Sequence, residues 1–77
     1  MFKEHDRIVL TRDIPEEGLK VGDVGTIIHI HRLGEAFEVE SLTLDGDTAA
    51  IATVLPSHAR PVSSRDITHA RQMELPV

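Results

Sequence analysis

The 77-residue sequence lacks cysteine, tryptophan and tyrosine, and it has only two phenylalanines. Without cysteine, the chain has no disulfide framework, no thiol nucleophile and no thiolate metal site. A chain of this length forms one small domain, which buries only about 60% of the surface that its unfolded form exposes. Such a domain has little room for a deep active-site cleft, so we expect a protein that is not an enzyme.

Targeting signals and long apolar runs are also missing. Residues 1–7 are mostly charged or polar, and no apolar segment follows them. No stretch approaches the roughly 20 apolar residues of a membrane-spanning helix. We therefore expect a cytoplasmic protein without a membrane segment.

Basic residues are scarce relative to acidic ones. The chain has 13 Asp and Glu against 8 Lys and Arg, a formal net charge of −5. Non-specific nucleic-acid binding depends on neutralisation of phosphates by Lys and Arg, so a nucleic-acid partner is not expected. The charges within residues 63–77 sum to zero, and the whole negative excess therefore belongs to residues 1–62.

Short segments rich in β-branched residues are present, separated by turn residues. Strands are predicted over residues 7–11, 24–31, 36–43, 48–55 and 59–62. A long loop is predicted over residues 12–23, tight turns at residues 33–34 and 45–46, and one helical turn at residues 56–58. The pattern predicts an all-β fold, a small SH3-like barrel of about five short antiparallel strands, whose closure would remove exposed sheet edges. An open four-stranded meander completed by dimerisation is the alternative, and we expect a monomer or a weak homodimer.

The second and third strands allow their register to be predicted. A turn at residues 33–34 pairs Ile30 with Phe37 and, two residues further along, Ile28 with Val39. The opposite face then pairs His29 with Glu38 and Ile27 with Glu40. One face is apolar and the other mostly polar, as a half-buried antiparallel sheet requires. The fourth strand alternates poorly, and a bulge at residues 45–46 would shift its register by one residue.

Residues 63–77 are predicted to be a polar tail attached to a barrel of residues 1–62. Ser63 or Ser64 could cap a helix over residues 65–73, with Ile67 and Ala70 on one side. A helix of about nine residues is marginal in isolation. We expect either a short C-terminal helix or a flexible tail.

The segment 19–28 is similar to the turn of the KOW motif, which occurs in SH3-like domains of ribosomal proteins and transcription factors. Gly22 and Gly25 are expected to adopt positive φ, so that the next strand can depart from a tight turn. Only Lys20 is basic in this neighbourhood. This favours a structural role for the glycines over RNA contact.

Two groups of residues could form a metal site or a catalytic site, and both have simpler explanations. His29 and His31 lie beside Glu38 and Glu40, which would allow a zinc site, but a solvated face with a cross-strand His–Glu pair is favoured. Ser57-His58 has no orienting carboxylate, and adjacent side chains seldom face each other as nucleophile and base. We predict no catalytic residues, no metal and no cofactor.

The scarcity of aromatic residues excludes two familiar uses of a small barrel. A groove for proline-rich peptides needs an aromatic lining, and binding of single-stranded nucleic acid depends on stacking aromatics. A binding surface must therefore be aliphatic and acidic, which favours a protein partner. The candidate binding residues are Ile14, Glu16, Glu17, Leu19, Lys20, Ile27, His29, Glu38 and Glu40.

Residues 2–19 and 22–27, the segment Phe37–Glu40 and the pair Arg60-Pro61 together resemble a small bacterial family, domain of unknown function 4926. The resemblance implies a stand-alone SH3-like module with no assigned activity and no catalytic residues. Some members are encoded beside small proteins proposed to be toxins, which implies an antitoxin or immunity role. Two of the family's usual aromatic positions, notably one near Arg32, are aliphatic or charged here, so the resemblance implies an altered binding face.

Two functions from different classes follow. The first is a protein-binding module that neutralises or regulates a basic partner through its long loop and acidic outer face, with electrostatic steering of the encounter. The alternative is a KOW-like accessory of the ribosome or transcription machinery that contacts RNA through Arg12, Lys20 and Arg32.

Overall fold

The computed structural model describes residues 2–74 and contains five strands and three short 3₁₀ turns. The strands are β1 (Arg7–Leu10), β2 (Val24–His31), β3 (Ala36–Leu42), β4 (Thr48–Val54) and β5 (Ala59–Pro61). The turns are η1 (Pro15–Glu17), η2 (Arg32–Gly34) and η3 (Pro56–His58). Each predicted strand agrees with the structure to within one residue at either end, and the predicted all-β fold is confirmed.

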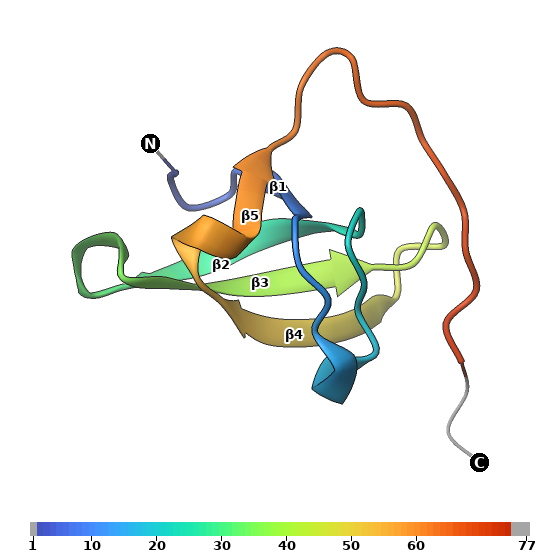
Figure 1. Cartoon of the computed structure of the whole chain (residues 1–77), viewed down its shortest axis with the longest axis horizontal. Helices are drawn as coiled ribbons and strands as arrows, with labels where there is room; N and C mark the ends of the chain where they lie inside the picture. Colours follow the sequence, from blue (N-terminus) through green and yellow to red (C-terminus); the bar gives the residue numbers. More distant parts are fainter. Residues whose placement is uncertain (1, 75–77) are drawn as a thin grey trace.

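All strands belong to one antiparallel sheet with the order β4-β3-β2-β1-β5. In Figure 1, β2, β3 and β4 lie one below another, and β1 and β5 continue the sheet beyond β2. The edges of the sheet are therefore β4 and β5. The alternative of a four-stranded meander is wrong, since β5 joins the sheet beside β1, while closure into an SH3-like barrel stays a prediction.

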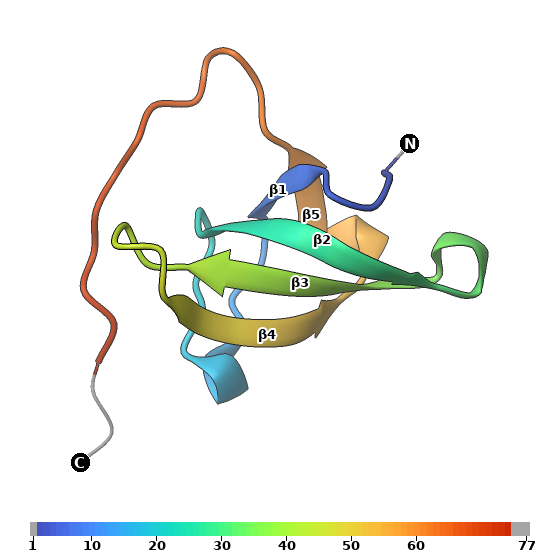
Figure 2. The same cartoon turned by 180° about the vertical axis from the view of Figure 1, so that it is seen from behind.

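The long loop between β1 and β2 covers one face of the sheet. Figure 1 shows the loop and η1 crossing in front of the strands, and Figure 2 shows the sheet in front of the loop from the other side. The apolar core lies between them and consists of Ile8, Leu10, Leu19, Ile27, Phe37, Val39, Ala50, Ala52 and Val54.

Leu19 belongs to this core, so its prediction as an exposed binding residue is wrong. Its side chain is 3% exposed. Gly18 ends η1 in the left-handed region at φ 71°, and the chain then reverses so that Ile14 and Leu19 form an isolated β-bridge. The reversal directs Leu19 inward, an effect of backbone conformation that a polar loop sequence does not indicate.

A bulge in β2 corrects the predicted register of the β2–β3 pair. Ile30 pairs with Phe37 and His29 with Glu38, as predicted, but the register shifts at Ile28, and Ile27 pairs with Val39. Ile27 is therefore fully buried and Ile28 is 41% exposed. The prediction of Ile27 on the outer face is wrong because one extra residue in β2 exchanges the faces of two identical side chains.

The β3–β4 pair also contains a register shift, between Ser41 and Leu42. This is three residues before the predicted bulge at residues 45–46. The shift leaves Ala50, Ala52 and Val54 buried. The poorly alternating β4 sequence thus supplies a regular set of small and branched side chains to the core.

Gly22 and Gly25 are needed for different reasons. Gly22 adopts φ 94°, as predicted for a tight turn. Gly25 lies within β2 and is not among the residues with positive φ. A Cβ at Gly25 would collide with Cγ1 of Val39 and lie 3.1 Å from the carbonyl oxygen of Glu40. The predicted positive φ at Gly25 is wrong, and close packing explains this glycine.

The tail contains no helix within its described residues 63–74, so the predicted helix over residues 65–73 is wrong. Arg60 and the backbone N–H of Ser63 donate hydrogen bonds to Asp66, and these bonds hold the pKa of Asp66 well below its usual range. Met73 packs against the core. A helix this short has little stability of its own, and the extended chain lets Met73 pack against the core and Arg71 donate to Asp23. Figure 1 shows the tail as an extended trace without a helix.

Candidate functional site

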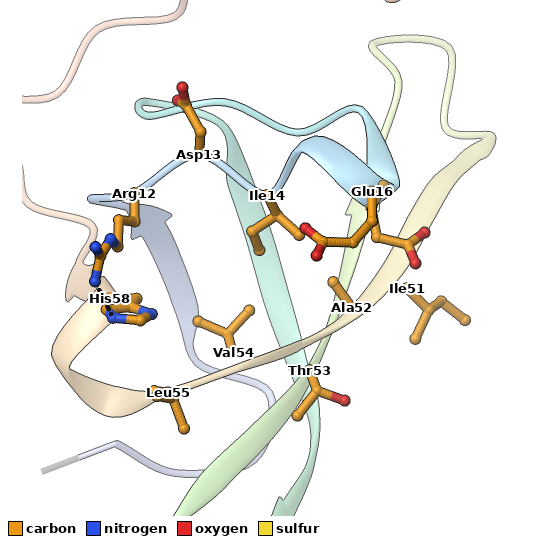
Figure 3. A pocket seen from close by; sticks show the side chains of 11 residues that line it. Arg12, Asp13, Ile14, Glu16, Ile51, Ala52, Thr53, Val54, Leu55 and His58 are labelled. Atoms are coloured by element: carbon orange, nitrogen blue, oxygen red, sulfur yellow. Dashed lines mark hydrogen bonds between the residues drawn. The ribbon is translucent and has the colours of Figure 1, made fainter. Parts of the chain in front are cut away.

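An open groove of about 560 Å³ lies between the long loop and β4. Three aliphatic side chains line its interior, and Figure 3 shows Ile14 of the loop facing Ala52 and Val54 of β4. Its full lining is Arg12, Asp13, Ile14, Glu16, Glu17, Ile51, Ala52, Thr53, Val54, Leu55 and His58. The groove therefore has an aliphatic interior and a charged rim.

The two ends of the groove differ in charge. Glu16 lies at one end near Ile51 and Ala52 (Figure 3), and the adjacent Glu17 also lines the groove. At the other end, Nη1 of Arg12 lies 3.0 Å from Nε2 of His58. The backbone N–H of Thr11 donates to the carbonyl oxygen of His58, which fixes η3 beside β1. The groove thus has an acidic end and an end formed by an Arg–His contact.

β4 forms one wall of the groove and has a free edge. Among the described residues, β4 pairs with β3 alone, and the backbone hydrogen bonds outside the sheet do not involve Thr48–Val54. In an antiparallel strand, alternate residues direct their N–H and C=O groups to each side. About half of the β4 backbone groups therefore point away from the sheet without a strand partner.

Hydrogen bonds across the strands order the polar outer face of the sheet. Nε2 of His31 lies 2.7 Å from Oε2 of Glu38, and the hydroxyl of Thr53 donates to the same oxygen at 2.8 Å. The hydrogen bond from His31, followed by that from Thr53, holds the pKa of the Glu38 carboxyl below its ordinary value. On the same face, the hydroxyl of Thr48 donates to Glu40 at 2.7 Å. The acidic side chains of β3 are thus anchored to β4.

The two histidine rings on this face pack against each other. The rings of His29 and His31 are 4.6 Å apart in an edge-to-face arrangement, and Nδ1 of His29 lies 3.9 Å from Glu4. Within residues 2–74, no group of three or more His, Asp or Glu side chains is placed to hold a metal ion.

The predicted binding residues separate into four groups. Ile14, Glu16 and Glu17 line the groove. His29, Glu38 and Glu40 lie on the outer face, while Leu19 and Ile27 are in the core. Lys20 is exposed in the loop, and its backbone N–H donates to Asp23 at 2.8 Å. The groove and the outer face are therefore distinct surfaces, and β4 is their common border.

Residues of β4 and η3 line the groove although sequence analysis did not select them. Ile51 and Leu55 are about half exposed, and His58 contacts Arg12. The signal was the segment Thr48–Leu55, which contains no charged residue and predicts a strand. The absence of charge becomes informative only when the strand order is known, because edge strands usually carry charged residues and central strands often do not.

A second depression, at the other end of β2 and β3, is apolar. It is lined by Phe2, Ile30, Leu33, Gly34, Phe37 and Pro56. Leu33 is fully exposed with φ 59°, and the ring of Phe2 packs edge-to-face on Phe37 with centroids 5.1 Å apart. This depression offers no charged or hydrogen-bonding side chain to orient a ligand.

Comparison with known proteins identifies one family. The family model described as Domain of unknown function (DUF4926) matches residues 4–61, well over half of the chain. No curated protein and no solved structure matches the sequence. The part of the chain that the structure describes contains no helix long and apolar enough to cross a membrane.

Proposed function

Because the chain belongs to the family Domain of unknown function (DUF4926), whose description assigns no activity, we propose its function from its surface. The protein is a non-enzymatic module that binds a basic protein through the groove and the adjoining β4. It acts in the bacterial cytoplasm, where it neutralises or regulates that partner as an antitoxin or immunity protein would.

The arrangement of carboxylates around β4 carries this proposal. Glu16 and Glu17 flank β4 on the groove side, and Glu38 and Glu40 lie next to it on the outer face. The strand between them is uncharged and partly apolar. An aliphatic centre with a charged rim is the usual composition of a protein interface, and the four carboxylates on the two sides of β4 favour a basic partner.

The charge of the whole chain supports the same partner. With a net charge of −5, the protein attracts a basic protein at long range and repels nucleic acid. Lys20 precedes β2 and Arg32 follows it, so the two basic residues flank a strand of eight residues, roughly 25 Å long. Two of the three residues proposed for RNA contact, Lys20 and Arg32, therefore lie at opposite ends of β2, and the RNA-binding alternative receives less support.

Affinity capture from the source organism tests the proposal. The immobilised protein is expected to retain a protein of net positive charge at 50 mM salt and to release it at 500 mM salt, because exposed charge pairs are screened. The variant E16K/E17K is expected to retain much less, whereas D45K/D47K, with the same charge change in the β3–β4 turn, retains most of it.

Three results would contradict the proposal. The first is retention that does not depend on Glu16 and Glu17. The second is recovery of no protein at either salt concentration. The third is recovery of RNA that is lost when Arg12, Lys20 and Arg32 are replaced, which would favour the RNA-binding alternative.

A further inference from the structure

We infer that the basic partner binds as an extended segment that pairs with the free edge of β4 and becomes a sixth strand of the sheet. This inference rests on the proposed function and specifies how the partner is held. Strand addition to an exposed edge is a recurrent mode of peptide recognition, in which backbone hydrogen bonds supply affinity and alternate side chains supply specificity.

The two edges of the sheet differ in how they are protected. β5 has three residues, and Arg60 and Pro61 occupy two of them. Short length, charge and proline are the devices by which proteins protect sheet edges from pairing. β4 has seven residues without charge or proline. Its register with β3 shifts at Ala49, and Ala50–Val54 then continue the ladder without interruption. β4 is thus an edge prepared for pairing.

The groove provides space beside this edge. The long loop approaches β4 at η1 and leaves beside the strand a depression of about 560 Å³, whose lining includes Ile51 through Leu55 in unbroken sequence. Within residues 2–74, backbone hydrogen bonds connect the loop to β1, η3 and itself and do not reach β4. An added strand would therefore enter without breaking a backbone hydrogen bond of the protein.

Alternation along the added strand predicts the chemistry of its side chains. One set of side chains would face the groove beside Glu16 and Glu17, and the other set would lie on the outer face. On that face, β3 is two strand spacings from the added strand, about 9.5 Å, so a Lys or Arg side chain can reach toward Glu40 across β4. Carboxylates lie on both sides of the edge, so a segment of alternating basic and apolar residues meets carboxylates with its basic set whichever face that set occupies.

A second copy of this chain fits the edge less well. It would bring the same net charge of −5 and a second set of the carboxylates that flank β4. Like charges placed opposite one another weaken strand pairing. The charge around the edge thus favours a basic segment over self-association.

The probe is an acetylated and amidated eight-residue peptide of alternating valine and lysine, titrated into the ¹⁵N-labelled protein and followed by NMR. We expect shift changes in Thr48–Val54, Glu16 and Glu17, slower exchange of alternate β4 amide protons, and a Kd that rises at least fivefold between 50 and 300 mM salt. The same peptide with N-methylated valines, which lacks the backbone donors along one edge, is expected to bind at least tenfold more weakly.

Two matched variants separate the edge from the remaining surface. I51K places a positive charge on β4, and I28K makes the same change at a similarly exposed position of β2. We expect I51K to abolish the peptide-induced shifts and I28K to preserve them. Unfolding curves of both variants establish that they are folded.

Several outcomes would overturn the inference. They are the absence of shifts in β4 at 2 mM peptide, equal binding of the N-methylated peptide, equal binding of a valine–glutamate peptide, and concentration-dependent dimerisation through β4. If partner capture depends on Glu16 and Glu17 while the N-methylated peptide binds equally, the binding function stands and strand addition is wrong. If the peptide binds at β4 while no basic protein is captured, the edge site stands and the proposed function is wrong.

Discussion

Gly25 shows how one residue sets the spacing of the sheet. Any Cβ at this position meets Cγ1 of Val39 in the neighbouring strand. We expect G25A to destabilise the protein by about 1–3 kcal/mol, the usual cost of overpacking, measured by urea unfolding.

A double-mutant cycle tests the cause. If G25A is destabilising because of the collision with Val39, then G25A/V39A should be more stable than the sum of the two single changes predicts, by at least about 0.5 kcal/mol. If the losses of stability in the two single variants are additive, the cost of G25A does not come from the collision with Val39.

Glu38 predicts a pH dependence of stability at the residue scale. Because its native pKa is lowered by His31 and Thr53, its contribution is present above its unfolded pKa, near 4.3, and is lost as pH falls through the native value. We expect stability to decline below about pH 5, and E38Q to lower stability at pH 7 by a few tenths of a kcal/mol, as befits a partly exposed pair, while making the decline shallower.

The control for this prediction is E40Q. Glu40 lies on the same face and accepts one hydrogen bond, from Thr48. Each variant removes one carboxylate from this face, so the difference between their pH profiles isolates the hydrogen bonds of Glu38 from the change in net charge. Parallel pH profiles for E38Q and the unmodified protein would contradict the role assigned to Glu38.

The bulge in β2 is a feature of an element, and two adjacent isoleucines test it. With the observed register, Ile27 is in the core and Ile28 is partly exposed. We expect I27A to cost about 2–5 kcal/mol, as for other core truncations, and I28A to cost less than about 1 kcal/mol. If I28A costs more free energy of unfolding than I27A in urea, the regular register without a bulge is correct instead.

The tail is held to the body by an ion pair. Arg71 Nε donates to Asp23 at 2.9 Å, and a second nitrogen of Arg71 donates to the carbonyl oxygen of Gly18 at 2.9 Å. Burial alone would raise the pKa of Asp23, but the hydrogen bond from Arg71 and that from the backbone N–H of Lys20 lower it below its ordinary value.

Loss of this ion pair is expected to release the tail. R71A should lower the heteronuclear NOE of residues 66–74 toward the values of a flexible chain, whereas R65A, which removes a tail arginine without a salt bridge in the described structure, should leave them unchanged. Equal NOE values in R71A and the unmodified protein would show that Met73 and the Arg60–Asp66 ion pair hold the tail without Arg71.

At the scale of elements, the sequence predicts the features that depend on neighbouring residues. It does not predict the features that depend on packing between distant segments. Turn residues and β-branched runs predicted the strands, because both act within a few residues. The bulge at Ile28 and the inward turn of Leu19 depend on packing against β3 and the core. The helix predicted over residues 65–73 is wrong for the same reason. Arg71 donates to Asp23, which lies 48 residues away along the chain, whereas a helix prediction considers only neighbouring residues.

At the scale of the whole molecule, the chain joins an acidic surface to an unprotected sheet edge. Sequence composition predicted the sign of that surface and three of the groove residues, Ile14, Glu16 and Glu17. It could not predict that β4 is an edge or that Arg12 meets His58, because both follow from the strand order. The central claim, that a basic protein binds beside β4, is a property of this assembled surface.

Site-specific photo-crosslinking in the source organism tests that claim most directly. A photoreactive phenylalanine analogue is placed at position 51, on β4, or at position 28, on β2, and adducts are identified by mass spectrometry. We predict a protein adduct of net positive charge from position 51 that disappears with E16K/E17K, and none from position 28. An adduct from position 28 alone, or none from position 51, would contradict the account.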